Sequence, residues 1–212
     1  MAERTVHCED AIAWLERNLG GIRDASLVSS MPDFSEFPHL TLEEWKTWFT
    51  NTAALILKSA PDNGVVVFYQ TDIKKFGTWV DKAYLCQKAA AETDHALLWH
   101  KLVCRVPPGA VTFGRPAYAH LLCFSKGVRV DLSRCTMDVL PETGDVPWSR
   151  GMGEKICKFI CEFILSHTET RKVVNPFCGY GSVLAAANAL GMEAVGIELS
   201  RRRAGKARIL GL

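Results

Sequence analysis

The segment from Lys172 to Ser200 constrains the fold more than any other part of the chain. Two short runs rich in β-branched and other apolar residues, 172–174 and 193–199, flank an alanine- and leucine-rich stretch of helical length. A tight turn that contains Gly179 and Gly181 follows the first run. This order predicts a strand, a turn, a helix and a second strand.

The same segment predicts a nucleoside-binding site. Glycines let the main chain approach a ligand at a helix N-terminus, with Ser182 expected as the N-cap and Gly191 just after the last turn. Glu198 lies about 20 residues beyond the glycines, where an acid can accept hydrogen bonds from both hydroxyls of a ribose. Leu184 stands where a dinucleotide fingerprint requires a third glycine, which disfavours an NAD-dependent oxidoreductase.

The rest of the chain repeats the alternation of strand and helix. Strands are expected at 4–8, 25–29, 65–69, 95–104 and 117–124, and helices at 11–19, from 41 to the turn at 61–64, at 77–93, at 149–166 and from 200 onward. Such alternation predicts βαβ units in a parallel sheet, and the last two of these strands are able to pair as an antiparallel hairpin. Residues 128–148 combine proline, glycine and mixed charges, so an irregular connection is expected there.

The position of the cofactor unit, last in the sequence, sets the expected topology. No strand follows its final helix, so the strand at 4–8 is expected to lie beside the strand at 193–199. We predict an α/β fold with a Rossmann-like, doubly wound mixed sheet that is mostly parallel and has an antiparallel hairpin strand. One domain, 1–212, is expected, with 1–127 as the catalytic and substrate half, 128–148 as the irregular connection and 149–212 as the cofactor-binding half.

Composition narrows the class of protein. The formal net charge of +2 does not by itself indicate a nucleic-acid-binding protein. The eight cysteines include no C-x-x-C pair, which favours reduced thiols in a cytoplasmic or other reducing intracellular compartment. Cys157 and Cys161 lie one helical turn apart without a nearby histidine, so we expect them in the core and predict no metal site. No apolar run reaches about 18 residues, so no membrane span is expected.

The run from Asn175 to Gly181, N-P-F-C-G-Y-G, resembles the cofactor motif D-P-F-x-G-x-G of S-adenosylmethionine-dependent amino-methyltransferases that act on nucleic-acid bases. Asparagine replaces the aspartate of that motif. With its catalytic segment first and its cofactor motif last, the chain resembles a circularly permuted group of these enzymes over nearly its whole length. The resemblance implies S-adenosyl-L-methionine as the cofactor, bound by Asn175, Phe177, Gly179, Gly181 and Glu198.

Asp10 is a further candidate for binding the cofactor. It follows the expected N-terminal strand at the edge where open α/β sheets bind ligands, so its carboxylate is placed to accept a hydrogen bond from the adenine amino group. An acid at this position suits a helix cap equally well. Both interpretations remain open at this point.

The residues Ser30, Met31, Pro32 and Asp33 stand where the family has D/N/S-P-P-Y/F/W. An exocyclic amine conjugated to a ring is a poor nucleophile, and acceptors that pull on its protons assist methyl transfer. The resemblance implies this role for Ser30 and for the carbonyl of Pro32. Asp33 replaces the aromatic residue, so Phe34 is expected to stack on the base and Asp33 to accept a proton or read a donor edge. A degenerate site is the alternative.

Two polar residues at later strands are weaker candidates. Asp72 leaves the strand at 65–69 at the same sheet edge, either as a second catalytic acid or as a turn cap. His100 lies within the strand at 95–104, and we expect a satisfied, half-buried histidine there rather than a base.

Basic and aromatic residues suggest where a substrate binds. Arg105, Arg115 and Tyr118 suit phosphate contact and base stacking, although scattered surface residues explain them equally. The basic run 201–208 suits a solvated helix face slightly better than a phosphate-binding patch.

Together these features predict a methyltransferase that transfers a methyl group from S-adenosylmethionine to an exocyclic amine of a nucleic-acid base. RNA is slightly favoured over DNA, because no stretch is long enough for a separate domain that reads duplex sequence. An activating protein subunit is a possible partner. The replacements at Asn175 and Asp33 motivate an alternative, a catalytically silent subunit that binds RNA or protein. The balanced net charge motivates another, methylation of a small amine or a protein side chain.

Overall fold

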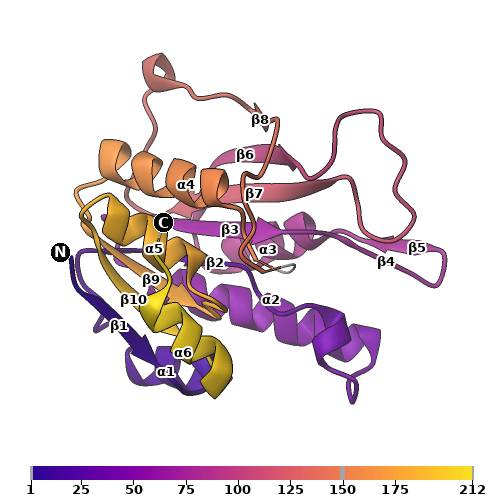
Figure 1. Cartoon of the computed structure of the whole chain (residues 1–212), viewed down its shortest axis with the longest axis horizontal. Coiled ribbons are helices and arrows are strands. Elements are labelled where there is room, and N and C mark those ends of the chain that lie inside the picture. Colours follow the sequence, from indigo (N-terminus) through magenta and orange to yellow (C-terminus); the bar gives the residue numbers. More distant parts are fainter. Residues whose placement is uncertain (1, 149–150, 212) are drawn as a thin grey trace.

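The computed structural model describes residues 2–148 and 151–211. At its centre is an eight-stranded sheet with the order β1-β10-β9-β2-β3-β7-β6-β8 (Figure 1). Its strands are β1 (Arg4–His7), β2 (Ala25–Ser29), β3 (Val66–Gln70), β6 (Ala96–Cys104), β7 (Tyr118–Ser125), β8 (Val139–Leu140), β9 (Lys172–Pro176) and β10 (Glu193–Ile197). Neighbouring strands from β1 across to β3 pair in parallel, and β7 is antiparallel to both of its neighbours. The predicted mixed α/β sheet is confirmed.

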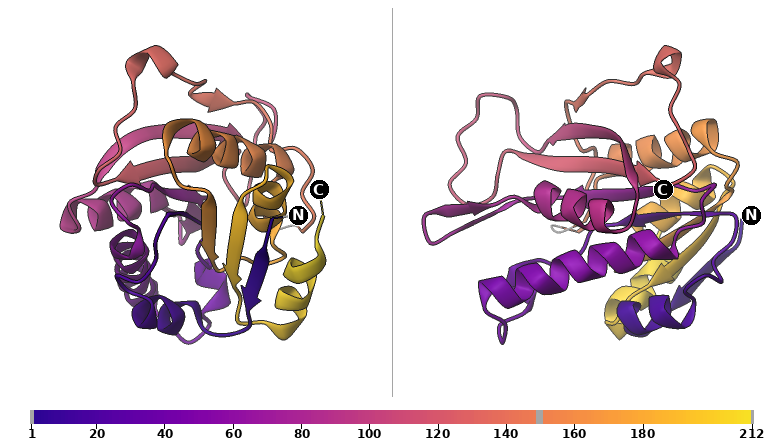
Figure 2. Two further views of the ribbon diagram at one scale, coloured as in Figure 1. Left: turned by 90° about the vertical axis from the view of Figure 1, so that its left-hand side faces the viewer. Right: turned by 180° about the vertical axis from the view of Figure 1, so that it is seen from behind.

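Helices cover both faces of the sheet, which confirms the doubly wound arrangement. They are α1 (Ala11–Arg17), α2 (Leu42–Ser59), α3 (Lys82–Glu92), α4 (Glu154–His167), α5 (Ser182–Ala189) and α6 (Arg201–Ile209), with 3-10 turns η1 (Phe34–Glu36) and η2 (Leu132–Arg134). The first three share one buried core with the sheet, and the last three share the other (Figures 1 and 2). Every residue of β2 and β3 is buried, as expected for strands covered on both faces.

The N-terminal strand lies where the topology required it. β1 pairs in parallel with β10, with Val6 opposite Gly196 (Figure 2). Arg4 fastens this strand to the last helix, because its guanidinium donates to the carbonyls of Ala207 (3.1 Å) and Leu210 (2.6 Å). Residues from opposite ends of the sequence therefore build one edge of the sheet.

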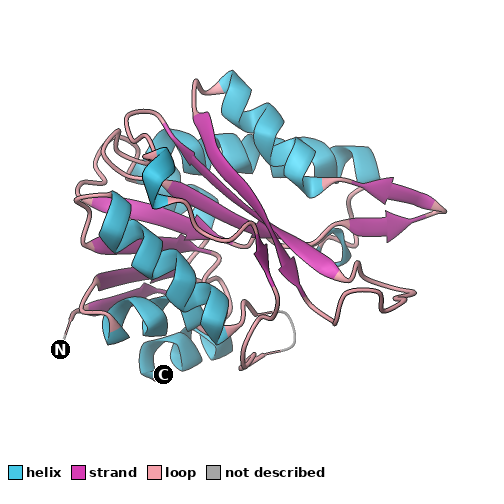
Figure 3. Ribbon diagram, turned by 90° about the horizontal axis from the view of Figure 1, so that it is seen from above, coloured by secondary structure: helices cyan, strands magenta, loops and turns pink. Residues whose placement is uncertain are grey.

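The helix expected at 77–93 starts later, at Lys82. Before it, β4 (Ile73–Lys75) and β5 (Thr78–Val80) form a hairpin outside the main sheet (Figure 3). Phe76 and Gly77 at its tip both have positive φ, which is the geometry of a two-residue hairpin turn. The sequence analysis missed this hairpin because phenylalanine is an unusual residue in such a turn.

Other differences concern the limits of elements. The connection 128–148 is not wholly irregular, since it contains η2 and the strand β8, which pairs with β6. Helix α4 begins at Glu154, and the expected helix start and domain boundary at 149 lie outside the described residues. The N-cap of α5 is Gly181 with φ +84°, not Ser182, which is the first helical residue. Within the described residues, no helix combines the length and hydropathy that a bilayer crossing requires.

Candidate active site

The carboxyl ends of β1, β2, β9 and β10 meet at one edge of the sheet, the usual ligand-binding edge of such folds. A cavity of about 270 Å³ lies there, and we call it the edge cavity. The sequence predicted six of the residues that line it: Asp10, Ser30, Pro32, Phe177, Gly179 and Glu198. Candidates from distant parts of the sequence therefore share one cavity.

The glycine turn after β9 depends on two glycines for different reasons. A Cβ atom on Gly179 would approach the ring of Trp148 to 3.2 Å, beside the edge cavity. A Cβ atom on Gly181 would lie 2.9 Å from the Cα atom of Ala207 in α6. Both glycines also have positive φ, where a side chain is strained. Gly179 thus keeps the main chain close to the cavity, while Gly181 lets α6 pack on the turn.

Glu198 closes the turn onto the end of β10. This side chain is only 5% exposed, and its carboxylate accepts hydrogen bonds from the backbone N–H of Gly179 (3.1 Å) and of Ser200 (2.8 Å). Arg203 places its Nε atom 3.1 Å from the same carboxylate. A carboxylate offers about four lone-pair sites, so these three contacts leave room for a further donor. The acid is held rigidly at the cavity wall.

Two hydrogen bonds tie the glycine-turn strand to the strand that carries the predicted catalytic loop. The buried Asn175 side chain donates to the carbonyl of Val28, and the Ser29 hydroxyl donates to the carbonyl of Pro176 (3.1 Å). An ionised aspartate has no hydrogen to donate to that carbonyl, which gives a physical reason for asparagine at this position. Asn175 lies beneath the turn and lines a small cavity of about 40 Å³ next to the edge cavity.

Leu184 packs against β10 at the place where the third glycine of a dinucleotide fingerprint would lie. A Cβ atom on Gly196 would come within 2.5 Å of the Leu184 Cδ1 atom. The glycine that permits close helix-to-strand packing is therefore in β10 and not in α5.

Four aromatic or basic side chains line the edge cavity without having been predicted as site residues: Phe37, Trp48, Trp148 and Arg203. Trp148 stacks on Tyr180 with 5.2 Å between ring centroids, and the Arg203 guanidinium lies 5.4 Å from the Trp148 ring. Trp48 from α2 also lines the cavity. Trp148 had a sequence signal, an isolated tryptophan just before the expected helix of the cofactor half. Trp48 had none, because its position in an amphipathic helix is typical of a core residue.

Asp10 proves to be the N-cap of α1. Its carboxylate accepts a hydrogen bond from the backbone N–H of Ala13 (2.9 Å), and the residue also lines the edge cavity. The capping role is confirmed. Contact with adenine remains a prediction that this position permits.

The predicted catalytic loop divides at Asp33. Ser30, Met31 and Pro32 line the edge cavity, but the Asp33 carboxylate lies 3.5 Å from the ammonium group of Lys82. The Lys82 side chain is only 3% exposed, and burial lowers its pKa while Asp33 opposes that shift. Asp33 therefore neutralises a buried charge, and Lys82 was missed because a lysine in the first turn of a helix is ordinarily exposed.

Asp33 and Phe34 line a second cavity of about 510 Å³ on the other side of the loop, which we call the groove. Lys74 and Lys75 of β4 and Arg115 also line it. Phe37 lines both the groove and the edge cavity, so the two are adjacent.

Asp72 is a structural anchor at the base of the groove. Its carboxylate accepts hydrogen bonds from the Lys82 backbone N–H (2.9 Å), from Trp79 Nε1 (2.9 Å) and from His120 Nε2 (2.8 Å). Burial raises the pKa of Asp72, but these hydrogen bonds outweigh it and the net pKa is below the ordinary value. Asp72 does not cap its own turn, because its three donors come from residues 79, 82 and 120, and the N-cap of α3 is Asp81. Catalysis by Asp72 remains a prediction. His100, which is exposed rather than half-buried, places its Nε2 atom 2.9 Å from His120 Nδ1.

Asp72, Asp81 and His120 bring one potential metal ligand atom each within 4.8 Å of one another. The bond between Asp72 and His120 and the hydrogen bond from the Tyr84 N–H to Asp81 (2.9 Å) already use these atoms as a protein network. We assign no metal to the cluster.

The three predicted substrate-binding residues do not lie together. Arg115 is exposed and lines the groove. Arg105 instead donates to the carbonyl of Pro116 (3.1 Å) at the base of its own loop, and Tyr118 packs edge-on against His120 with 5.3 Å between ring centroids. Only Arg115 among the three reaches the groove next to the edge cavity.

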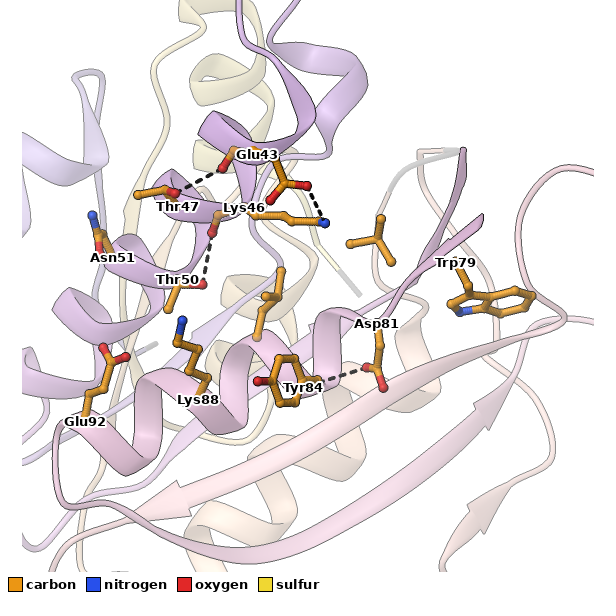
Figure 4. Close-up of a pocket in the computed structure, with 12 residues that line it drawn as sticks. Glu43, Lys46, Thr47, Thr50, Asn51, Trp79, Asp81, Tyr84, Lys88 and Glu92 are labelled. Atoms are coloured by element: carbon orange, nitrogen blue, oxygen red, sulfur yellow. Dashed lines mark hydrogen bonds and ion pairs between the residues drawn. The ribbon is translucent and has the colours of Figure 1, made fainter. Parts of the chain in front are cut away.

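A further surface cavity of about 510 Å³ lies between α2 and α3 (Figure 4). Acidic and basic side chains alternate around it, including Glu43, Lys46, Lys88 and Glu92. None of the residues predicted for the site is among the described residues that line it. It does not contribute to the candidate site.

No protein-family model and no curated protein sequence matches this chain. Several solved structures share its fold. The PvuII DNA methyltransferase (cytosine-N4-specific) has a TM-score of 0.75 and 14% identity, over 98% of this chain and 86% of that chain. A Thermus thermophilus protein assigned as a DNA modification methylase, complexed with S-adenosyl-L-methionine, has a TM-score of 0.69 and 18% identity, over 96% and 91%. M1.HpyAVI in complex with SAM has a TM-score of 0.65 and 13% identity, over 97% of each chain. At these identities the likeness establishes the fold alone.

Proposed function

We propose that this chain is a methyltransferase that uses S-adenosyl-L-methionine to methylate an exocyclic amine of a nucleic-acid base. One observation carries the proposal. The edge cavity is lined both by the glycine turn with Glu198 and by the loop with Ser30 and Pro32, so a cofactor site and an amine site would be continuous. The names of two proteins with this fold, which specify DNA methylation, support the proposal.

The residues present fit the cofactor. Gly179 leaves the main chain open to a ligand, and Glu198 keeps an unused acceptor site for ribose hydroxyls. Phe177 and Trp148 supply apolar walls, and Asp10 offers an acceptor near the end of β1. The volume of about 270 Å³ is close to the lower end of the range of about 300–1,000 Å³ for ligand pockets. When bound, S-adenosylmethionine supplies an electrophilic methyl group.

In this proposal the chain contributes alignment and hydrogen-bond acceptors. The Ser30 hydroxyl and the Pro32 carbonyl accept hydrogen bonds from the target amine and hold its lone pair toward the cofactor. The hydrogen bonds of Asn175 and Ser29 fix the spacing between the two halves of the site. Direct displacement would form the bond from the amine nitrogen to the methyl carbon as the bond from that carbon to the cofactor's sulfur breaks. The demethylated cofactor would leave, and the surplus amine proton would pass to solvent.

The proposal also includes a choice between DNA and RNA as the substrate. The sequence slightly favoured RNA, and nothing in the fold supports that preference. Two proteins of the same fold carry names that specify DNA, so we propose DNA as the first substrate to test. We also propose that the chain forms one domain in the permuted order, within a reducing compartment.

A catalytically silent subunit that binds nucleic acid or protein is a second candidate. One observation favours it: Arg203 lines the edge cavity and pairs with Glu198, the acid proposed to hold the ribose. If an added partner subunit moves Arg203 away from Glu198 and methyl transfer then occurs, the chain is a dormant enzyme. If transfer does not occur with any partner, the chain is a catalytically silent protein.

The test is methyl transfer from S-adenosylmethionine with a labelled methyl group to mixed DNA and, separately, to total cellular RNA, with nucleosides analysed by mass spectrometry. We expect a labelled N-methyl nucleoside from wild type and at least a tenfold loss in Ser30→Ala, in line with the usual contribution of a catalytic acceptor of about 10²- to 10⁴-fold. Ser133→Ala, an exposed serine of η2 that lines neither the edge cavity nor the groove, is the matched control. Cofactor binding without label in either nucleic acid would contradict the proposal.

A further inference from the structure

Two segments project together from the molecule beyond the end of β3. They are the β4–β5 hairpin, 73–80, and the loop 105–117 between β6 and β7, and we call them the arm (Figures 1 and 3). The Lys74 ammonium donates to the carbonyl of Thr112 (3.3 Å), which joins the two segments. The arm is therefore one feature built from two separate parts of the sequence.

The arm exposes large aromatic side chains. Phe113 is 95% exposed and Phe76 is 83% exposed, and each is near the tip of its segment. Trp79 is 48% exposed, and Lys74 lies 4.7 Å from its ring. Full exposure of such rings costs free energy in water, so a surface that carries them is typical of a binding site.

The charge of the arm has a single sign. Its two segments contain Lys74, Lys75, Arg105 and Arg115 and no acidic residue, although the whole chain has a net charge of only +2. Lys74, Lys75 and Arg115 are exposed. Basic groups interleaved with aromatic rings match the phosphates and the bases of a nucleic-acid strand.

The arm leads to the candidate active site. Lys74, Lys75 and Arg115 of the arm line the groove together with Phe34 of the loop after β2. The Lys75 ammonium lies 5.5 Å from the Phe34 ring, so the arm contacts this loop. Because Phe37 lines both cavities, a strand lying in the groove would lie next to the edge cavity.

We infer that the arm binds unpaired nucleotides next to the base that is methylated, with Lys74, Lys75 and Arg115 on phosphates and with Phe76 and Phe113 stacked on bases. Stacking requires an open base face, which a single strand offers and an intact duplex covers. This inference rests on the proposed function and adds to it the part of the chain that holds the substrate.

The test is fluorescence anisotropy with a labelled 12-nucleotide single-stranded DNA of mixed sequence, and with the same oligonucleotide in a duplex. We expect Phe76→Ala/Phe113→Ala to weaken single-strand binding at least about thirtyfold, since each of the two stacked bases contributes about 1–3 kcal/mol. Lys74→Gln/Lys75→Gln should reduce the slope of log affinity against log salt by about 1.4. Duplex binding should be weaker and insensitive to the phenylalanine substitutions.

Two controls make the result specific. Ile209→Ala removes another highly exposed apolar side chain, and Arg201→Gln/Arg202→Gln removes two exposed charges from α6. We expect both to bind the single strand within about twofold of wild type. Unchanged affinity in both arm variants, or a loss confined to the α6 variant, would overturn the inference.

Cofactor titration and methyl transfer on the same variants separate this inference from the proposed function. The arm variants should bind S-adenosylmethionine as wild type does and should lose transfer in proportion to oligonucleotide binding. If oligonucleotide binding depends on the arm but wild type transfers no methyl group, the proposed methyltransferase function is overturned and the arm is a nucleic-acid-binding surface only. If the arm variants transfer methyl groups as well as wild type does, only the inference about the arm is overturned.

Discussion

The glycine-turn region, 172–200, and the substrate region, formed by the loop 30–37 and the arm, meet at the same sheet edge but are held in different ways. In the first region main-chain groups take part in most of the contacts: Glu198 accepts from the N–H groups of Gly179 and Ser200, the Asn175 side chain donates to a carbonyl, and φ is positive at Gly179 and Gly181. In the second, charged or polar side chains that are far apart in sequence pair with each other. Asp33 pairs with Lys82, and Asp72 bonds to His120, 48 residues away.

This difference teaches where sequence motifs are informative. A turn built from local backbone geometry requires particular residues at fixed spacing, so it leaves a motif. A loop held by distant side-chain pairs can exchange partners while it keeps its position. In this chain the loop is anchored through Asp33 by Lys82, a residue that lies outside any motif of the loop itself.

The largest effect is expected from Gly181→Val in the glycine-turn region. A side chain there meets positive φ and backbone atoms of α6 at 2.9 Å, so strain and overpacking together should lower the free energy of unfolding by about 2–6 kcal/mol. Urea denaturation measures the change. Gly205→Ala in α6 is the control, since no atom lies within 4 Å of the added methyl, and it should stabilise by about 0.4–1 kcal/mol. Similar stabilities for the two variants would refute the packing argument.

In the substrate region, the two members of the Asp33–Lys82 pair should differ. Asp33→Ala leaves a buried ammonium without its partner and should destabilise by about 3 kcal/mol. Lys82→Met removes the charge whose pKa burial already lowers, and it leaves Asp33, a quarter exposed, in contact with water, so stability at pH 7 should fall by less than about 1 kcal/mol. Equal losses in thermal denaturation would contradict this.

The double variant Asp33→Ala/Lys82→Met sharpens the role of Asp33. It should regain the stability lost in Asp33→Ala. If methyl transfer also returns to the level of Lys82→Met, Asp33 acts by anchoring the loop. If transfer stays at the level of Asp33→Ala, Asp33 accepts a proton from the amine, as the sequence suggested.

Asp72→Asn should destabilise the base of the arm by about 1–3 kcal/mol at pH 7, because a buried acceptor of three hydrogen bonds is altered. The pKa of Asp72 is below its ordinary value of 3.8 in the folded state, so the ionised carboxylate stabilises the fold above that value. That stabilisation is lost as pH falls through the lowered pKa. Unfolding between pH 7 and pH 2 should therefore show wild type and variant converging in acid, and a constant difference would contradict the assignment.

The smallest effect should come from Asp10→Ser, which separates capping from cofactor contact. Serine caps a helix as well as aspartate, so the melting temperature should change little. Its shorter side chain cannot reach a ligand in the edge cavity, so affinity for S-adenosylmethionine should fall about fivefold if one hydrogen bond of about 1 kcal/mol is lost. Unchanged affinity would leave Asp10 as a cap alone.

Sequence reasoning succeeded where the physics is local. It predicted the turn and the position of Glu198, because glycine spacing and apolar runs encode them. The non-local pairing of the N-terminal strand with β10 was predicted for another reason, the strand that the topology of the cofactor unit required. It missed the β4–β5 hairpin, whose tip at Phe76 has no standard turn signal, and it missed Lys82, whose burial depends on helix packing. Neither feature has a signature in neighbouring residues.

The most direct test of the central claim is calorimetric titration of the purified chain with S-adenosylmethionine and with its demethylated product, repeated for Glu198→Ala and for Ser30→Ala. We predict that wild type and Ser30→Ala bind both compounds with similar affinity. Glu198→Ala should bind at least about tenfold more weakly, since hydrogen bonds to a charged group contribute about 1.5–3 kcal/mol. No binding by folded wild-type protein, or equal binding by Glu198→Ala, would contradict the account.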